Sequence, residues 1–322
     1  VPKEKYTHAP EILQHCHNIA QHYDLYNRAC LQTQVTGMSW EETQKRWIIK
    51  TDRGDAMQAR FVIMSNGPLN RPKLPGIPGI TDFEGHTFHT SRWDYDYTGG
   101  TSEGNLDRLA DQRVAIIGTG ATAVQCIPHL GASAKSLHVF QRTPSSIDVR
   151  ANRPTDADWA KSLPKGWQKA RMENFNALTS GRIVEEDLVM DGWTEIIRNL
   201  ISMANYRGKD IDPRDIPKLM EMADFQKMEQ IRARVDTLVE DPKTAEALKP
   251  YYRQFCKRPC FHDNYLQTFN RPNVTLVDTQ GQGVTSMSAN GVTANGQTYE
   301  VDCVIFATGF EVGTAYTRRA GY

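Results

Sequence analysis

Hydrophobic and polar positions follow their clearest pattern in the middle of the chain, where two short apolar runs flank a glycine-rich turn. The first run, residues 114–117, precedes Gly118-Thr119-Gly120, and the second covers residues 137–140. Between them, apolar residues recur at helical spacing over residues 124–130. This order of strand, glycine turn, helix and strand within about 30 residues predicts a βαβ unit of the type that binds dinucleotides.

Each residue of the glycine-rich turn has a physical role in such a unit. Gly118 allows the tight turn, Gly120 lets the backbone approach a pyrophosphate, and Ala123 is the small residue that lets the helix pack on the strand. Thr119 and Ala121 complete the turn. Phosphates bind at the free N–H groups and the positive dipole end of the helix that follows. The turn therefore predicts a phosphate-binding site.

The second strand ends in Gln141-Arg142, without the acidic residue that an NAD site normally has there. A carboxylate would bind the ribose 2′-hydroxyl but repel a 2′-phosphate. A guanidinium can bind that phosphate through two parallel hydrogen bonds. We therefore interpret the nucleotide as NADP(H). The alternative for Arg142 is an ordinary surface arginine without a ligand.

Two other regions carry β patterns. Near the N-terminus, after a helix that opens at Pro10, we expect strands at residues 31–35, 46–51 and 59–64. The last of these is an apolar run that stops shortly before Gly67.

A similar pattern occurs near the C-terminus. Asn295-Gly296 indicates a hairpin, and an apolar strand at residues 301–306 follows it and stops before Gly309. We interpret the strands before Gly67 and Gly309 as returning to a cofactor domain, where glycine lets backbone approach a ligand. The alternative is that these are two unrelated β meanders whose sequences happen to look alike.

From about residue 155 to 252 the sequence is polar, contains methionines and has a helical period. Asp241-Pro242 is typical of a helix start, with Asp as the N-cap and Pro in the first turn. We expect a helical insertion suited to covering a cleft. One amphipathic stripe there is interpreted as core packing; its residues are Trp193, Ile196, Ile197, Leu200 and Ile201.

Composition narrows the functional classes. The 322 residues can form two domains, and 38 basic residues balance 38 acidic ones, so there is no electrostatic case for binding nucleic acid or an anionic membrane. No apolar run reaches the 18 residues of a membrane segment. The six cysteines include no C-x-x-C pair, and Cys126 and Cys303 lie in apolar element interiors, which favours reduced thiols and a cytoplasmic protein. His15-x-His17 and Cys256-x-x-x-Cys260 lack a zinc spacing, so no metal site is expected.

Four motifs resemble those of the flavin-dependent Baeyer–Villiger monooxygenases (class B flavoprotein monooxygenases). One is the glycine-rich turn; the others are residues 140–144, residues 257–259, and a fingerprint ahead of the turn. The fingerprint consists of Phe83, Gly85, His89, Trp93 and Asp94.

The resemblance implies roles for individual residues. Arg142, Thr143 and Lys257 would hold the NADP 2′-phosphate. Arg258 would be the active-site arginine beside the flavin, and His89 would lie in the hinge that couples nucleotide binding to catalysis. Without the resemblance, Lys257-Arg258 reads as a solvated basic pair and His89 as a packing residue.

The resemblance also implies an activity. NADPH would reduce FAD, a C4a-peroxyflavin would form with O2, and a small-molecule ketone would gain one oxygen atom to give an ester or lactone. The alternatives are a flavin monooxygenase that oxidises nitrogen or sulfur, and a non-catalytic NADP-binding protein.

The implied fold is α/β: a Rossmann-like NADP-binding domain with a helical insertion, and a remnant of a FAD domain. No G-x-G-x-x-G for FAD occurs before Val114, so we expect an internal fragment that binds FAD poorly alone. The expected boundaries are 1–67 for the partial FAD domain, 68–150 and 256–306 for the two parts of the NADP domain, 151–255 for the insertion, and 307–322 for the return into the FAD domain.

Overall fold

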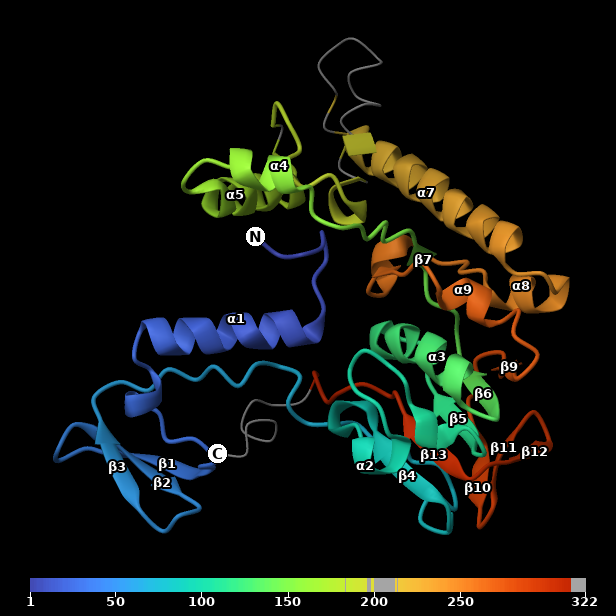
Figure 1. The fold of residues 1–322 in the computed structure, drawn as a ribbon, viewed down its shortest axis with the longest axis horizontal. Coiled ribbons are helices and arrows are strands. Elements are labelled where there is room, and N and C mark those ends of the chain that lie inside the picture. Colours follow the sequence, from blue (N-terminus) through green and yellow to red (C-terminus); the bar gives the residue numbers. More distant parts are fainter. Residues whose placement is uncertain (183, 196–197, 200–211, 213, 314–322) are drawn as a thin grey trace. The chain divides into compact units, whose positions relative to one another are not determined.

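The computed structural model describes residues 1–182, 184–195, 198–199, 212 and 214–313 (Figure 1). The chain divides into two compact units. The larger unit consists of Val1–Thr7 and Gly76–Ala307, and the smaller unit of His8–Pro75 and Thr308–Tyr322.

A five-stranded parallel sheet forms the centre of the larger unit, and it confirms the α/β fold class. Its strands, in spatial order, are β4 (His86–His89), β13 (Cys303–Phe306), β5 (Arg113–Ile117), β6 (Ser136–Gln141) and β9 (Val274–Asp278). Helix α3 (Ala121–Ser133) connects β5 to β6, as the glycine-rich pattern predicts. Strand β4 lies inside the fingerprint and was not predicted. The C-terminal strand begins at Cys303, two residues later than expected.

Alternate residues of the sheet pack on its two faces. Val114 and Ile116 of β5 share a core with α3 and with parts of α7, α8 and α9, whereas Ala115 and Ile117 pack toward a small antiparallel sheet. That sheet consists of β10 (Ser286–Ser288), β11 (Gly291–Ala294) and β12 (Gln297–Glu300). The predicted hairpin is confirmed, with left-handed φ at both Asn295 and Gly296, as its tight turn requires.

The predicted helical block contains helices joined by loops, and no named strand is described between its helices. It lies between two short paired strands, β7 (Ile147–Asp148) and β8 (Cys260–Phe261). Besides α3, the described part of the larger unit includes the helices α2 (Tyr95–Thr98), α4 (Ala157–Ser162), α5 (Trp167–Thr179), α7 (Ile216–Leu238), α8 (Pro242–Leu248) and α9 (Tyr265–Thr268).

Asp241 caps α8 as predicted, because its carboxylate accepts the Thr244 N–H at 2.8 Å. Trp193 packs against Phe261 with 5.5 Å between ring centroids. The rest of the predicted stripe lies outside the described residues.

The smaller unit holds helix α1 (Ala9–His22) and an antiparallel sheet of β1 (Val35–Glu41), β2 (Arg46–Thr51) and β3 (Ala56–Ala59). The strands expected at 31–35 and 59–64 were misplaced. Trp40 pairs across from Trp47, with centroids 5.7 Å apart, so β1 extends toward that pair. Phe61 and Ile63 are 84% and 90% exposed and belong to no strand, because no described strand lies beside them.

Candidate cofactor-binding site

The residues predicted to bind the nucleotide follow the carboxyl ends of neighbouring parallel strands in the larger unit. The glycine-rich turn follows β5, Arg142 follows β6, and Ala307 follows β13. Strand β5 lies between the other two, so the order of the strands reverses there: β6 follows β5 on one side, and the later strand β13 lies on the other. In open α/β sheets, ligands bind at such a switch point.

Gly118 is required by both conformation and space. Its φ is +111°, and a Cβ there would lie 2.5 Å from the Ala307 carbonyl oxygen. Its N–H also donates to the Phe140 carbonyl at 3.0 Å. The turn is therefore fixed between the ends of β6 and β13.

Gly120 has the opposite surroundings, since a Cβ there would meet nothing within 4 Å. It is the N-cap of α3, and no side chain caps this helix end. The N–H groups of Ala121 and the next residues have no partner within the helix, so they can bind an anion. Ala123 is fully buried against the core, which fits the packing role predicted for it.

Two hydroxyl groups join the glycine-rich turn to the loop after β6. The buried Thr119 donates from Oγ1 to the Thr143 carbonyl at 3.0 Å. In return, Ser145 Oγ donates to the Thr119 carbonyl. Sequence reasoning missed Ser145, because a lone serine in a loop carries no pattern.

The three residues assigned to the 2′-phosphate gather at this loop. Lys257 Nζ donates to Thr143 Oγ1 and lies 3.5 Å from the Pro144 carbonyl. Burial lowers the pKa of Lys257, and the nearby positive charge of Arg142 lowers it further. Lys257 is thus bonded to a hydroxyl and feels the positive charge of Arg142, which is an arrangement that an anion would stabilise.

Arg258 follows Lys257 directly and precedes β8. Its side chain is exposed, and its carbonyl accepts a weak hydrogen bond from Cys260 Sγ at 3.6 Å. The catalytic role assigned to Arg258 stays a prediction.

His89 ends β4, the edge strand, and is aligned with Phe306 of β13. Three strand spacings separate it from β6, which is about 14 Å. The ring is buried, and its Nδ1 accepts the Ser91 N–H at 3.1 Å. The structure therefore places His89 away from the Arg142 cluster, and its hinge role stays a prediction.

The other fingerprint residues have contacts that explain them locally. Asp94 caps α2 by accepting the Tyr97 N–H at 3.0 Å, and it also pairs with His86 at 2.9 Å. Trp93 donates its indole N–H to Thr98 at 3.0 Å. Gly85 is needed because a Cβ there would lie 2.5 Å from the Asp302 carbonyl oxygen.

Gly67 and Gly309 belong to the smaller unit. Both have a left-handed φ, +65° and +79°, and open space where a Cβ would lie. The Gly309 carbonyl accepts the Lys73 N–H at 2.9 Å. Their backbone is thus accessible, and their predicted contact with a cofactor is untested.

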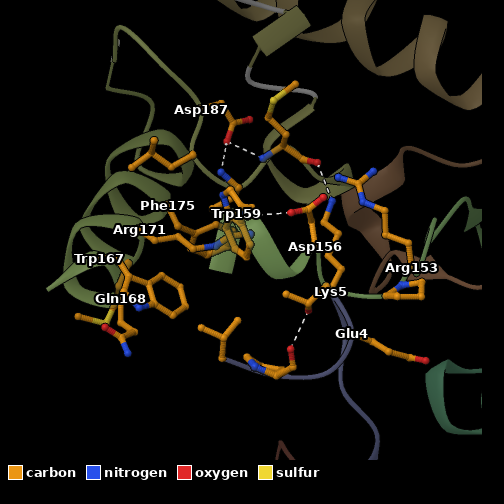
Figure 2. Close-up of a pocket in the computed structure, with 18 of the residues that line it drawn as sticks. Glu4, Lys5, Arg153, Asp156, Trp159, Trp167, Gln168, Arg171, Phe175 and Asp187 are labelled. Carbon is orange, nitrogen blue, oxygen red and sulfur yellow. Dashed lines mark hydrogen bonds between the residues drawn. The ribbon is translucent and has the colours of Figure 1, made fainter. Parts of the chain in front are cut away.

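The larger unit also has a cavity of about 880 Å³ that contains none of the predicted site residues. Trp159 of α4 and Trp167 and Phe175 of α5 line it, together with Lys5 and Arg153 from other segments (Figure 2). It is formed by the first residues of the chain and the start of the helical block.

Within the described ranges, no three His, Cys, Asp or Glu side chains are grouped so as to hold a metal ion. None of the helices described combines the length and apolar character of a membrane span. All six cysteines are free.

Known proteins resemble the chain along its whole length. The family described as pyridine nucleotide-disulphide oxidoreductase matches residues 1–180. Neopentalenolactone D synthase of Streptomyces avermitilis is 59% identical over 324 residues, covering 100% of this chain and 54% of its own length. Baeyer-Villiger monooxygenase ATR8 of Stachybotrys chlorohalonatus is 56% identical, covering 99% of this chain and 51% of its own.

Two solved structures resemble the fold as well. The polycyclic ketone monooxygenase of Thermothelomyces thermophila has a TM-score of 0.87 and 38% identity, covering 100% of this chain and 54% of its own. The OTEMO complex with FAD and NADP has a TM-score of 0.79 and 28% identity, covering 99% and 60%. The chain spans about half the length of the curated relatives it matches.

Proposed function

Because the chain belongs to the pyridine nucleotide-disulphide oxidoreductase family, we propose that it is the NADPH-binding part of a Baeyer–Villiger monooxygenase. Such an enzyme uses NADPH, FAD and O2 to insert one oxygen atom into a small-molecule ketone, giving an ester or lactone. The close relatives named as Baeyer-Villiger monooxygenases support this activity.

One observation carries the nucleotide assignment. Thr143 and Lys257 come together beside Arg142, next to an uncapped helix N-terminus. In this arrangement the N-terminus of α3 and Gly120 would hold the pyrophosphate, and the two cations with Thr143 would hold the 2′-phosphate. The bound nucleotide supplies a hydride, while the protein orients it.

Arg258 would act as a fixed positive charge at the reacting centre. A guanidinium stays protonated at any relevant pH, so it can stabilise negative charge that develops on oxygen. Arg258 directly follows Lys257 in the sequence, so the proposed catalytic residue is adjacent to a proposed ligand of the 2′-phosphate.

FAD is a cofactor of the proposed enzyme, but the residues present do not form its whole site. This sequence has no G-x-G-x-x-G before Val114, and Gly67 and Gly309 offer only accessible backbone. We propose that these two glycines contact FAD in the complete enzyme. The free cysteines support a cytoplasmic protein, and the balanced charge supports small-molecule rather than nucleic-acid partners.

The nucleotide assignment is tested by titrating the purified chain with NADPH and with NADH. Charge-assisted hydrogen bonds contribute about 1.5–3 kcal/mol each, less at an exposed site, so NADPH should bind roughly 10- to 100-fold more tightly. Equal affinities would contradict it.

The oxygenation is tested in the complete enzyme with isotopically labelled O2. A cyclic ketone should gain one labelled oxygen atom, whereas preferential labelling of a sulfide would favour the nitrogen- or sulfur-oxidising alternative.

A further inference from the structure

Tyr252 contacts both halves of the proposed 2′-phosphate site. It lies between α8 and the 3₁₀ turn at Gln254–Cys256, and its side chain is partly buried. Its hydroxyl donates to the Pro144 carbonyl at 3.0 Å and accepts the Ser146 N–H at 2.9 Å. The hydroxyl thus bonds to the loop that follows Thr143 at two points, Pro144 and Ser146.

The ring of Tyr252 contacts the other half. Lys257 Nζ lies over the ring, 4.6 Å from its centroid, which is a cation–π geometry. The same ammonium donates to Thr143 Oγ1. One side chain therefore fixes the loop through its hydroxyl and the lysine through its ring.

The bonds of the hydroxyl exclude a direct role as a phosphate ligand. A tyrosine has one O–H donor, and here that donor is used on the Pro144 carbonyl. Burial raises the pKa of Tyr252, so this donor stays protonated at neutral pH.

The lysine needs such support. A free lysine side chain has about 2 kcal/mol of rotamer entropy, and the nearby positive charge of Arg142 disfavours the charged ammonium. The ring attracts the ammonium and holds it near Thr143 before any anion arrives. Less entropy is then lost when a phosphate binds.

We propose that Tyr252 is a positioning residue that sets the preference for NADPH over NADH by holding Lys257 and the Thr143 loop in place. This proposal rests on the proposed function, because it needs a 2′-phosphate at the cluster.

The test measures the affinities of the purified chain for NADPH and NADH in three variants. Tyr252→Leu removes both the ring and the hydroxyl and should lower the NADPH preference about tenfold. Tyr252→Phe keeps the ring and should lower it about threefold. The neighbouring Tyr251 is exposed and bonds to Glu246, so Tyr251→Phe should leave the preference unchanged.

A double variant separates positioning from a general effect on folding. If the ring acts through Lys257, then Tyr252→Leu in a Lys257→Met background should lower the preference only about threefold further, which is the part that the hydroxyl contributes through the loop, instead of tenfold. The affinity for NADH should stay within about twofold throughout, which shows that the nucleotide site remains folded.

Three results would overturn parts of this account. If wild type prefers NADPH and Tyr252→Leu keeps that full preference, the positioning role is wrong and the proposed function stands. The positioning role is also wrong if NADPH and NADH weaken by the same factor. A wild-type chain without any preference would overturn the 2′-phosphate site itself, and Tyr252's role with it.

Discussion

The two units differ in how much of their apolar surface is removed from water. In the larger unit, sheet residues such as Ile116 and Val304 are fully buried between two layers. In the smaller unit, α1 has no buried residue, and Phe61 and Ile63 are almost fully exposed.

The difference between the two units distinguishes elements that form from contacts close in sequence from elements that need partners far away in the sequence. A helix and a hairpin form from contacts close in sequence, so α1 and β1–β2 are present without a core. An apolar strand becomes a strand only beside another strand, and residues 61–64 have none among the described residues. We therefore expect the larger unit to hold most of the stability of this chain.

Two leucines in helices test this most strongly. Leu130 of α3 is fully buried, whereas Leu13 of α1 is 59% exposed. Leu130→Ala should lower the free energy of unfolding by about 2–5 kcal/mol, and Leu13→Ala should change it by less than about 0.5 kcal/mol. Urea unfolding followed by circular dichroism measures both. Similar losses would mean that α1 packs as tightly as α3.

The two units can also be compared at one glycine each, Gly118 and Gly309, both of which have a left-handed φ. Gly118→Ala must displace the Ala307 backbone as well as strain φ, so we expect a loss of about 2–3 kcal/mol. Gly309→Ala has open space and should cost only about 1 kcal/mol. Thermal unfolding midpoints compare them, and a smaller loss at Gly118 would show that the turn adjusts freely.

Nucleotide binding should depend on charges in the larger unit alone. Arg142→Ala removes a guanidinium from the phosphate site and should weaken NADPH binding roughly tenfold, with NADH binding unchanged. Arg60→Ala, an exposed arginine in the smaller unit, is the matched control and should change neither. Fluorescence titration distinguishes these outcomes, and equal weakening of both nucleotides would place Arg142 outside the phosphate site.

The NADPH preference should also fall at alkaline pH. Burial and Arg142 place the pKa of Lys257 below its ordinary value of 10.5, and a bound phosphate would raise it again. NADPH binding should therefore take up protons there. The ratio of the two affinities should fall severalfold as pH rises through the pKa of the free site. A ratio that stays constant up to pH values above 10.5 would show that the ammonium is not used.

The smallest expected effect lies at the exposed apolar run. Changing Phe61 and Ile63 together to Ser should alter the free energy of unfolding by less than about 0.5 kcal/mol. It should also reduce aggregation, because large exposed apolar side chains promote association. Light scattering measures the second effect, and a clear loss of stability would show that these residues are covered in solution.

Sequence reasoning succeeded where a pattern and its burial partners lie close together. The β5–α3–β6 unit and the 291–300 hairpin have both, and so they were predicted nearly to the residue. Strands β1 and β3 were misplaced because their ends depend on cross-strand pairs such as Trp40 with Trp47.

Within the site, Arg142, Thr143 and Lys257 were expected together from the family resemblance; Lys257 bonds to Thr143, which follows Arg142 in the chain, and the shared role in binding the 2′-phosphate stays a prediction. Tyr252 was missed, since a tyrosine in a polar block has no periodic signature. The partners of its hydroxyl lie more than a hundred positions earlier in the sequence.

The strand order has a consequence for how the protein is made. On a ribosome, β4 emerges early, but its neighbour in the sheet is β13, the last strand of the larger unit. The β5–β6 pair can form during synthesis, whereas the β4 edge of the sheet waits until residues 303–306 leave the exit tunnel. Closure of such distant pairs is slow. The β4 edge therefore lacks its sheet neighbour while residues 90–302 are made, and an unpaired strand edge promotes association with other chains.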